Sequence, residues 1–141
     1  MKTIFTIFLS LVLAKGCGEE ANAIDSAVVE YEALSRGFYK TIKIENKKLY
    51  VVKSRNDKPH EVSLSAKQWN SLVELFKEIN LDELSNLKAP TEKRMYDGAA
   101  HARFAVTLDG KNYSTQSFDH GHPPVAIEKF VNKLTELSFK E

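Results

Sequence analysis

The segment SFDHGHPP, near the C-terminal end of the chain, brings two histidines and an aspartate together. If this segment is extended, His120 and His122 project on the same side of the backbone, as two zinc ligands can. A zinc site needs a third or fourth ligand, which His101 or Asp97 could supply only through the fold. The alternative is turn chemistry, in which Asp119 binds local backbone amides and the histidines stay at the surface.

A second polar group lies in the segment TEKRMYDG, between two predicted elements. Loops held by a rigid scaffold commonly carry binding residues, and an arginine that precedes Gly37 could join this loop in space. We therefore expect one binding patch, made of Arg36, Arg94, Asp97, Asp119 and His120. The alternative is that Arg94 with Asp97, or Arg36 with Asp119, forms salt bridges that only fix loops and contribute little if exposed.

The sequence contains no familiar catalytic motif. It has no G-x-S-x-G elbow, phosphate-binding loop, dinucleotide fingerprint or zincin helix. A pair of acids for sugar cleavage would be visible only in the fold. We therefore expect no catalytic residues and no cofactor. The alternative is a metal-dependent or other hydrolytic enzyme that uses the loop of Asp119, His120 and His122, with His101 as a further metal ligand.

Cys17 is the only cysteine, so the chain cannot form an internal disulfide. It follows an uncharged apolar run of eleven residues, Ile4 to Ala14, which is about half the length that crosses a bilayer and is typical of a signal peptide. Ala14, Gly16 and Cys17 resemble the lipobox of bacterial lipoproteins, in which the cysteine is acylated and becomes the mature N-terminus. Lys15 departs from that pattern, because a small uncharged residue is usual there.

The lipobox resemblance implies an anchor of two or three acyl chains, palmitate among them, whereas one chain alone binds a membrane only marginally. We expect a signal peptide over residues 1–16, an acidic tether over 17–26 and one domain over 27–141. The expected location is the cell envelope, on the periplasmic or surface face of the outer membrane. Ala21-Asn22-Ala23 also fits ordinary signal cleavage, which would discard Cys17 and release a soluble secreted product.

The composition fits a single globular domain. Of the 141 residues, 43% are hydrophobic and 28% are charged. The formal net charge is +1, so the chain lacks the basic surface that nucleic-acid binding requires. The expected partners are the membrane, through the lipid anchor, and a protein of the envelope.

Alternation of apolar and polar residues predicts strands in two parts of the chain. Ile42 and Ile44, for example, share a face opposite Thr41 and Lys43. The predicted strands cover residues 29–33, 39–45, 49–55, 61–65, 102–108 and 112–118. The Asp109-Gly110 pair between the last two is the strongest hairpin signal.

Helical spacing replaces alternation in two other segments. Ser65 and Gln68 have the spacing of a capping box, and apolar residues from Trp69 to Ile79 follow at intervals of three and four. A second helix is predicted after Pro123-Pro124. The fold class expected from this order is α+β: a strand meander, a helix, a β-hairpin and a helix, with both helices on one face of an antiparallel sheet.

This order, with Ser35-Arg36-Gly37-Phe38 leading into a strand and Asp109-Gly110 between late strands, is similar to emfourin-type inhibitors of thermolysin-like metalloproteases over residues 30–137. It also looks like small Gram-negative lipoproteins of unknown function. We expect a lipid-anchored binding or structural domain that is not an enzyme, with a protease-inhibitor module as a third option. A binding domain should have an exposed apolar patch, whereas an enzyme should have a pocket with His120, His122 and a carboxylate. An inhibitor should have a projecting loop.

Overall fold

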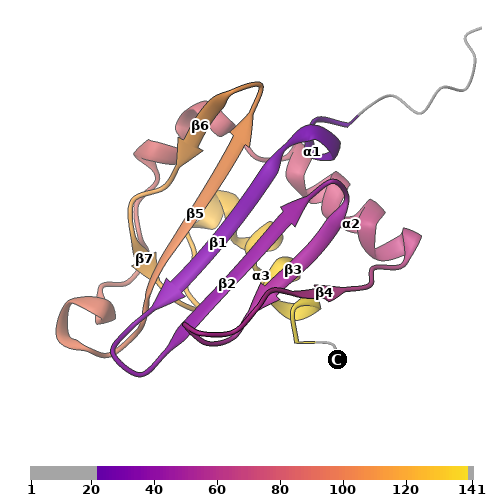
Figure 1. The fold of residues 1–141 in the computed structure, drawn as a ribbon. Coiled ribbons are helices and arrows are strands. Elements are labelled where there is room, and N and C mark those ends of the chain that lie inside the picture. The colour runs from indigo at the N-terminus through magenta and orange to yellow at the C-terminus, as the bar shows by residue number, and fades with distance from the viewer. Residues whose placement is uncertain (1–21, 140–141) are drawn as a thin grey trace, which may run out of the picture.

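The fold is built on one antiparallel sheet, which Figure 1 shows face-on. The structure is a computed structural model and describes residues 22–139. The strands lie in the order β4-β3-β2-β1-β5-β6, and β7 pairs with β5 off this path. Their bounds are Val28–Leu34 (β1), Tyr39–Glu45 (β2), Lys48–Val52 (β3), His60–Val62 (β4), His101–Leu108 (β5), Lys111–Ser114 (β6) and Phe118–Asp119 (β7). β1 is central and pairs with β2 and β5.

The strands have a buried and a less buried face, as the alternation predicts. In β2, Lys40, Ile42 and Ile44 are buried, whereas the residues between them are not. Two hairpins close with turns whose two central residues have positive φ, which matches the right-handed twist of the strands. These turns are Asn46-Lys47, with φ of 52° and 61°, and Asp109-Gly110, with φ of 51° and 77°. The predicted Asp109-Gly110 hairpin is confirmed.

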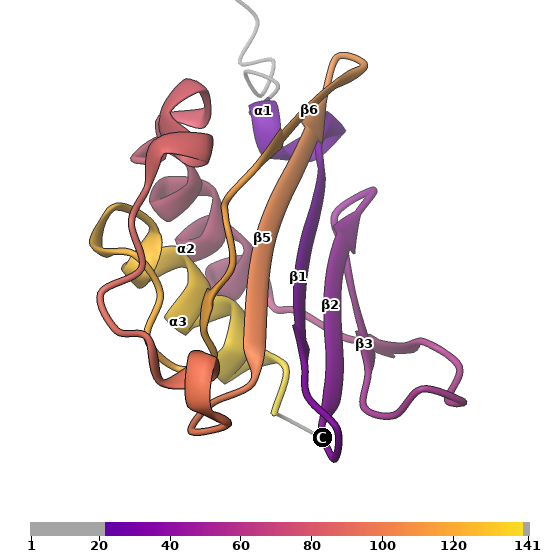
Figure 2. The same cartoon turned by 90° about the vertical axis from the view of Figure 1, so that its left-hand side faces the viewer.

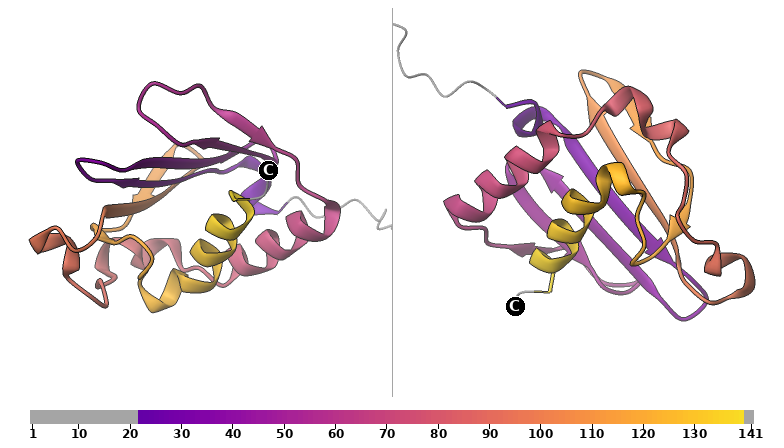
Figure 3. Two further views of the ribbon diagram at one scale, coloured as in Figure 1. Left: turned by 90° about the horizontal axis from the view of Figure 1, so that it is seen from below. Right: turned by 180° about the vertical axis from the view of Figure 1, so that it is seen from behind.

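Two longer helices cover the buried face of the sheet. These are α2 (Ala66–Lys77) and α3 (Glu128–Leu137); the shorter ones are α1 (Ala23–Ser26) and the 3-10 helices η1 (Leu81–Asn86), η2 (Lys93–Tyr96) and η3 (Val125–Ile127). Figures 2 and 3 show α2 and α3 together on one side of the sheet. The expected α+β architecture, with both helices on one face, is confirmed.

The core between helices and sheet is centred on aromatic rings. Phe130 of α3 packs edge-on against Phe104 of β5 and against Phe76 of α2, with 5.7 Å between ring centroids in each pair. The predicted capping box starts α2: the Gln68 amide donates to Ser65 Oγ at 3.1 Å, and the Ser65 amide donates to Gln68 Oε1 at 2.8 Å. α2 is therefore held at its start by the capping box and along its apolar face by the packing of Phe76 against Phe130.

Several boundaries differ from the sequence expectation. α3 begins at Glu128 rather than just after the two prolines, because η3 comes between them. The last predicted strand is interrupted, and β6 and β7 pair with β5 separately. Residues 23–26, expected to belong to the tether, form α1, and Ile24 is 1% exposed within the core. Cys17 and the expected signal peptide lie outside the described residues.

Phe130→Ala tests this packing. Phe130 is 1% exposed and contacts both neighbouring rings, so its truncation should lower the free energy of unfolding by about 3–5 kcal/mol. Trp69→Ala is the matched control, because Trp69 is only partly buried and should cost less. Urea denaturation followed by circular dichroism measures both. Equal losses in the two variants would contradict the packing described.

Candidate functional site

Asp119, at the end of β7, accepts hydrogen bonds from the loop that precedes β5. Its carboxylate accepts from Thr91 Oγ1 at 2.6 Å, from the Lys93 amide at 2.7 Å and from the Arg94 amide at 2.9 Å. The Arg94 guanidinium adds an ion pair at 3.1 Å. The Asp119 side chain is 0% exposed and that of Arg94 is 7% exposed. This buried pair joins residues that lie 25 positions apart in the sequence.

The charge on Asp119 is maintained by its hydrogen bonds. Burial alone raises the pKa of Asp119, but the bonds from the Thr91 hydroxyl, from the Arg94 and Lys93 amides and from the Arg94 guanidinium outweigh it. The pKa of this carboxyl is therefore held well below its usual range. Asp119 stays ionised at neutral pH and acts as a fixed anchor for the loop.

The anchored loop displays two large side chains to solvent. Met95 is 67% exposed and Tyr96 is 72% exposed. The loop turns back directly after them: Asp97 has a φ of 60°, and the Gly98 amide donates to the Lys93 carbonyl at 2.8 Å. A Cβ on Gly98 would lie 3.1 Å from that same carbonyl oxygen, so the turn leaves little room for a side chain. We call the exposed pair Met95 and Tyr96 the loop tip.

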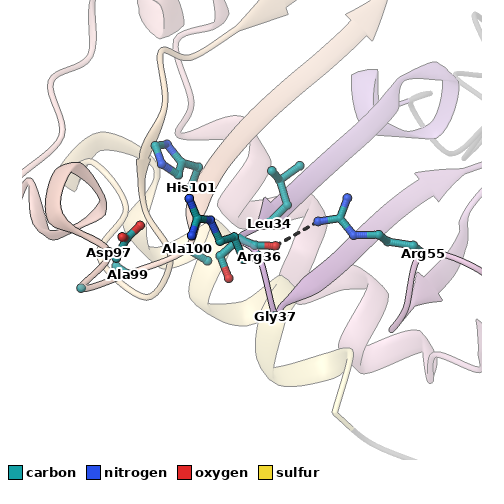
Figure 4. A pocket seen from close by; sticks show the side chains of 10 residues that line it. Leu34, Arg36, Gly37, Arg55, Asp97, Ala99, Ala100 and His101 are labelled. Atoms are coloured by element: carbon teal, nitrogen blue, oxygen red, sulfur yellow. Dashed lines mark hydrogen bonds between the residues drawn. The ribbon is translucent and has the colours of Figure 1, made fainter.

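An open pocket of about 730 Å³ adjoins the loop tip, between the β1–β2 turn and the start of β5 (Figure 4). Arg36, Asp97 and His101 line it, together with Arg55, whose Nη2 donates to the Ser35 carbonyl at 2.9 Å. Among the described residues, none of these four charged or titratable side chains forms an ion pair with another. The pocket therefore presents two guanidinium groups and one carboxylate to a ligand.

His120 faces a different part of the fold. Its Nδ1 lies 2.6 Å from the Tyr31 hydroxyl, and its ring packs against Phe38 with 5.1 Å between centroids. Burial, followed by the charge of Lys40, lowers the pKa of His120 below its usual value. Burial also raises the pKa of Tyr31 far above its usual range, so the phenol stays protonated. The His120–Tyr31 contact therefore joins two neutral groups at neutral pH.

The expected five-residue patch divides into three parts. Arg94 and Asp119 pair with each other, in place of the pairs Arg94–Asp97 and Arg36–Asp119 considered from the sequence. Arg36 and Asp97 line the pocket, and His120 contacts Tyr31 instead. The five residues therefore belong to the buried anchor of the loop, to the adjoining pocket and to a separate contact with Tyr31.

The His-x-His segment is a turn and not an extended strand. The His122 amide donates to the Asp119 carbonyl at 2.9 Å, and Gly121 between the histidines has a φ of 91°. His101 pairs with Asp119 across β5 and β7 and lines the pocket. Within residues 22–139, no three histidine, cysteine, aspartate or glutamate side chains are grouped so that they could hold a metal ion.

Sequence reasoning missed several residues of this region. The Thr91 hydroxyl donates a hydrogen bond directly to the Asp119 carboxylate. Arg55 reaches the pocket from the turn after β3. Lys40 lies in register with the two isoleucines of β2 on the buried face, so continuing the alternation by one step would have found it. No comparable local signal exists for Thr91, because its partner is 28 positions away.

Asp119→Asn tests the anchor. The substitution leaves Arg94 buried without a carboxylate, so the free energy of unfolding at pH 7 should fall by about 3–5 kcal/mol. Because the folded-state pKa is depressed, the stabilisation by Asp119 is present above the unfolded pKa of about 3.9 and is lost as pH falls below it. As the pH is lowered below about 4, the free energy of unfolding measured by urea denaturation should therefore decrease less in Asp119→Asn than in the wild type.

Asp97→Asn is the matched control for this prediction. Asp97 is exposed, and asparagine tolerates its left-handed backbone conformation. Its stability and acid dependence should stay close to those of the wild type. Loss of stability in Asp97→Asn equal to that in Asp119→Asn would contradict the assigned anchor.

Comparison of the chain with protein-family models, with curated proteins and with solved structures finds no match. None of the helices in the described part of the chain has both the length and the apolar character that crossing a bilayer requires. The functional interpretation therefore depends on the sequence pattern and on the geometry of this loop and pocket.

Proposed function

We propose that this protein is a lipid-anchored protein of the bacterial cell envelope whose domain binds a protein partner through the loop tip and the adjoining pocket. The observation that carries the binding proposal is the loop tip itself. Met95 is 67% exposed and Tyr96 is 72% exposed. They lie on a loop whose backbone amides donate hydrogen bonds to the buried Asp119. A loop that is already ordered loses little conformational entropy on binding.

The composition of this surface fits a protein interface. Tyrosine, methionine and arginine are enriched where protein partners meet, and tyrosine and arginine often contribute most of the affinity. The surface combines Met95 and Tyr96 with Arg36 and Arg55. A partner that offers an apolar cleft flanked by carboxylates would complement both the loop tip and the pocket.

The proposed anchor is Cys17, five positions before the first described residue, Asn22. Figure 1 shows α1 at one end of the sheet and the β1–β2 turn at the opposite end, beside the loop that precedes β5. β1 alone, with 7 residues, extends about 23 Å between these ends. An anchor next to α1 would therefore leave the loop tip at the end of the domain away from the attachment point.

The packing of α1 also bears on the alternative of cleavage after Ala23. That cleavage would make Ile24 the first residue of a secreted product, although Ile24 is 1% exposed and belongs to the core. It would place a charged amino group beside an apolar site, which is costly. It would also remove the Asn22 amide, which donates to Asp25 Oδ2 at 3.2 Å. Acylation at Cys17 leaves this part of the fold intact.

A protease-inhibitor module is the second candidate for the domain. An inhibitor needs a projecting loop that keeps its shape in a protease cleft, and the anchored loop tip has this property. The metal-dependent or hydrolytic alternative is not supported by a comparable feature, because His120 contacts Tyr31 and His122 lies beyond a turn.

Cys17→Ser tests the proposed anchor. In cells fed tritiated palmitate, the wild-type protein should be labelled and should sediment with membranes, because its acyl chains bury methylene groups in the bilayer. Cys17→Ser should be unlabelled and should leave the membrane pellet or accumulate uncleaved. Ser10→Ala, within the apolar run, is the control and should behave as the wild type. An unlabelled wild type would contradict the anchor.

A photo-crosslinking phenylalanine analogue at position 96 tests the binding surface in intact cells. Illumination should join the protein to one partner species, because Tyr96 lies at the centre of the proposed interface. The same analogue at position 125 is the control, since Val125 is 79% exposed but belongs to η3 and not to the loop that carries the loop tip. Met95→Ser should abolish the adduct without changing thermal stability. Equal adducts from positions 96 and 125 would contradict the proposal, and an inhibited metalloprotease as the adduct would identify the inhibitor candidate.

A further inference from the structure

Lys40 occupies an unusual position on the buried face of the sheet. The alternation of β2 directs it to the same side as Ile42 and Ile44, and it is 4% exposed. Lysine is almost never buried to this extent unless a charged partner accompanies it. The surroundings of its amine therefore decide what this side chain can do.

The amine of Lys40 lacks a hydrogen-bond partner. Within residues 22–139, its Nζ atom has no acceptor within hydrogen-bonding distance. The ring of Phe139 covers it instead, with 3.5 Å between Nζ and the ring centroid. An aromatic face attracts a cation but does not replace the hydrogen bonds of water. Phe139 follows α3 and is itself 67% exposed, so its ring can move without disturbing the core.

The groups that face Lys40 favour the neutral form of its amine. Lys53 follows β3 and continues the register that pairs Thr41 with Val52, so it lies across from Lys40. Burial, followed by the charge of Lys53, lowers the pKa of Lys40 to about 8. At pH 7 about a tenth of the amines are then unprotonated, against fewer than about one in a thousand for an ordinary lysine. Burial and a neighbouring cation are the usual means by which proteins activate a lysine nucleophile.

Tyr31 and His120 form a neighbouring hydrogen-bonded pair. The Tyr31 hydroxyl and His120 Nδ1 are 2.6 Å apart. The charge of Lys40 contributes to the low pKa of His120, which indicates that the ring lies near the amine. A neutral imidazole that accepts a hydrogen bond from the Tyr31 hydroxyl at Nδ1 carries its own proton on Nε2. His120 can then donate a hydrogen bond from Nε2 while Tyr31 holds Nδ1.

We propose that Lys40 is a reactive amine that forms an imine with a small aldehyde or ketone, under the movable ring of Phe139. The apolar surroundings and the missing acceptor distinguish this site from the exposed lysines of the sheet. A simple anion would instead bind the protonated amine, and the experiment below distinguishes this outcome.

The reaction balances without an added oxidant or reductant. The neutral Nζ attacks the carbonyl carbon, a C–N bond forms, and the carbonyl electron pair moves to oxygen, which takes up a proton. The nitrogen then loses a proton, the hydroxyl group is protonated and leaves as water, and the nitrogen lone pair forms the C=N bond. Water supplies and takes back these protons, and the Nε2–H of His120, held by Tyr31, can donate a hydrogen bond to the carbonyl oxygen. Amine and carbonyl thus become imine and water.

The test is reductive trapping on the full-length protein purified in detergent. Acetaldehyde and cyanoborohydride convert each imine into an ethylated lysine, and peptide mass spectrometry gives the rate at every lysine. Lys43 is the internal control, because it lies on the other face of β2 and pairs with Glu45 at 3.0 Å. Lys40 should react at least about tenfold faster than Lys43 at pH 7, because the lowered pKa of Lys40 raises its neutral fraction above that of an ordinary lysine.

Three further measurements make the result decisive. The Lys40 rate should level off above about pH 8, where most of its amine is neutral. Phe139→Ala should speed labelling of Lys40 alone, and Tyr31→Phe should slow it alone. Labelling of Lys40 no faster than that of Lys43 in Phe139→Ala would overturn the proposal. Selective suppression of Lys40 labelling by excess inorganic phosphate would assign the amine to anion binding and would also overturn it.

Discussion

The buried carboxylate of Asp119 is the constraint on which the proposed binding end of this domain depends. A desolvated charge is costly unless hydrogen bonds surround it, and here the bonds come from Thr91, Lys93 and Arg94. Satisfying Asp119 therefore requires the loop before β5 to adopt one conformation. That conformation places Met95 and Tyr96 in solvent and brings Asp97 to the wall of the pocket. The hydrogen bonds to Asp119 therefore both order the loop and keep Met95 and Tyr96 exposed.

The two ends of the sheet have different chemistry. At one end, α1 packs Ile24 into the core, and Ile24 follows Cys17, the proposed lipid attachment, by seven positions in the sequence. At the other end, the β1–β2 turn, the loop tip and the pocket collect exposed apolar groups and guanidinium groups. The pairing of β1 with both β2 and β5 connects these ends through the most buried part of the sheet. This division is suited to a domain attached at one end and free to bind at the other.

Features that depend on local pattern could be predicted from the sequence. The capping box of Ser65 and Gln68 and the turn at Asp109-Gly110 involve residues a few positions apart, and both form as expected. The ion pair of Arg94 and Asp119 joins distant segments, so sequence spacing suggested other partners for both residues. Lys40 is an intermediate case: the alternation places it on the buried face, but a lysine is normally assigned to the surface.

Amide hydrogen exchange tests the role of Asp119 in ordering the loop most directly. The amides of Lys93 and Arg94 are bonded to a carboxylate with no exposed surface. They should exchange as slowly as the amide of Phe104 in β5, because release of either bond requires exposure of the buried ion pair. Exchange of both loop amides at the rate of an unstructured chain, while Phe104 stays protected, would contradict the account.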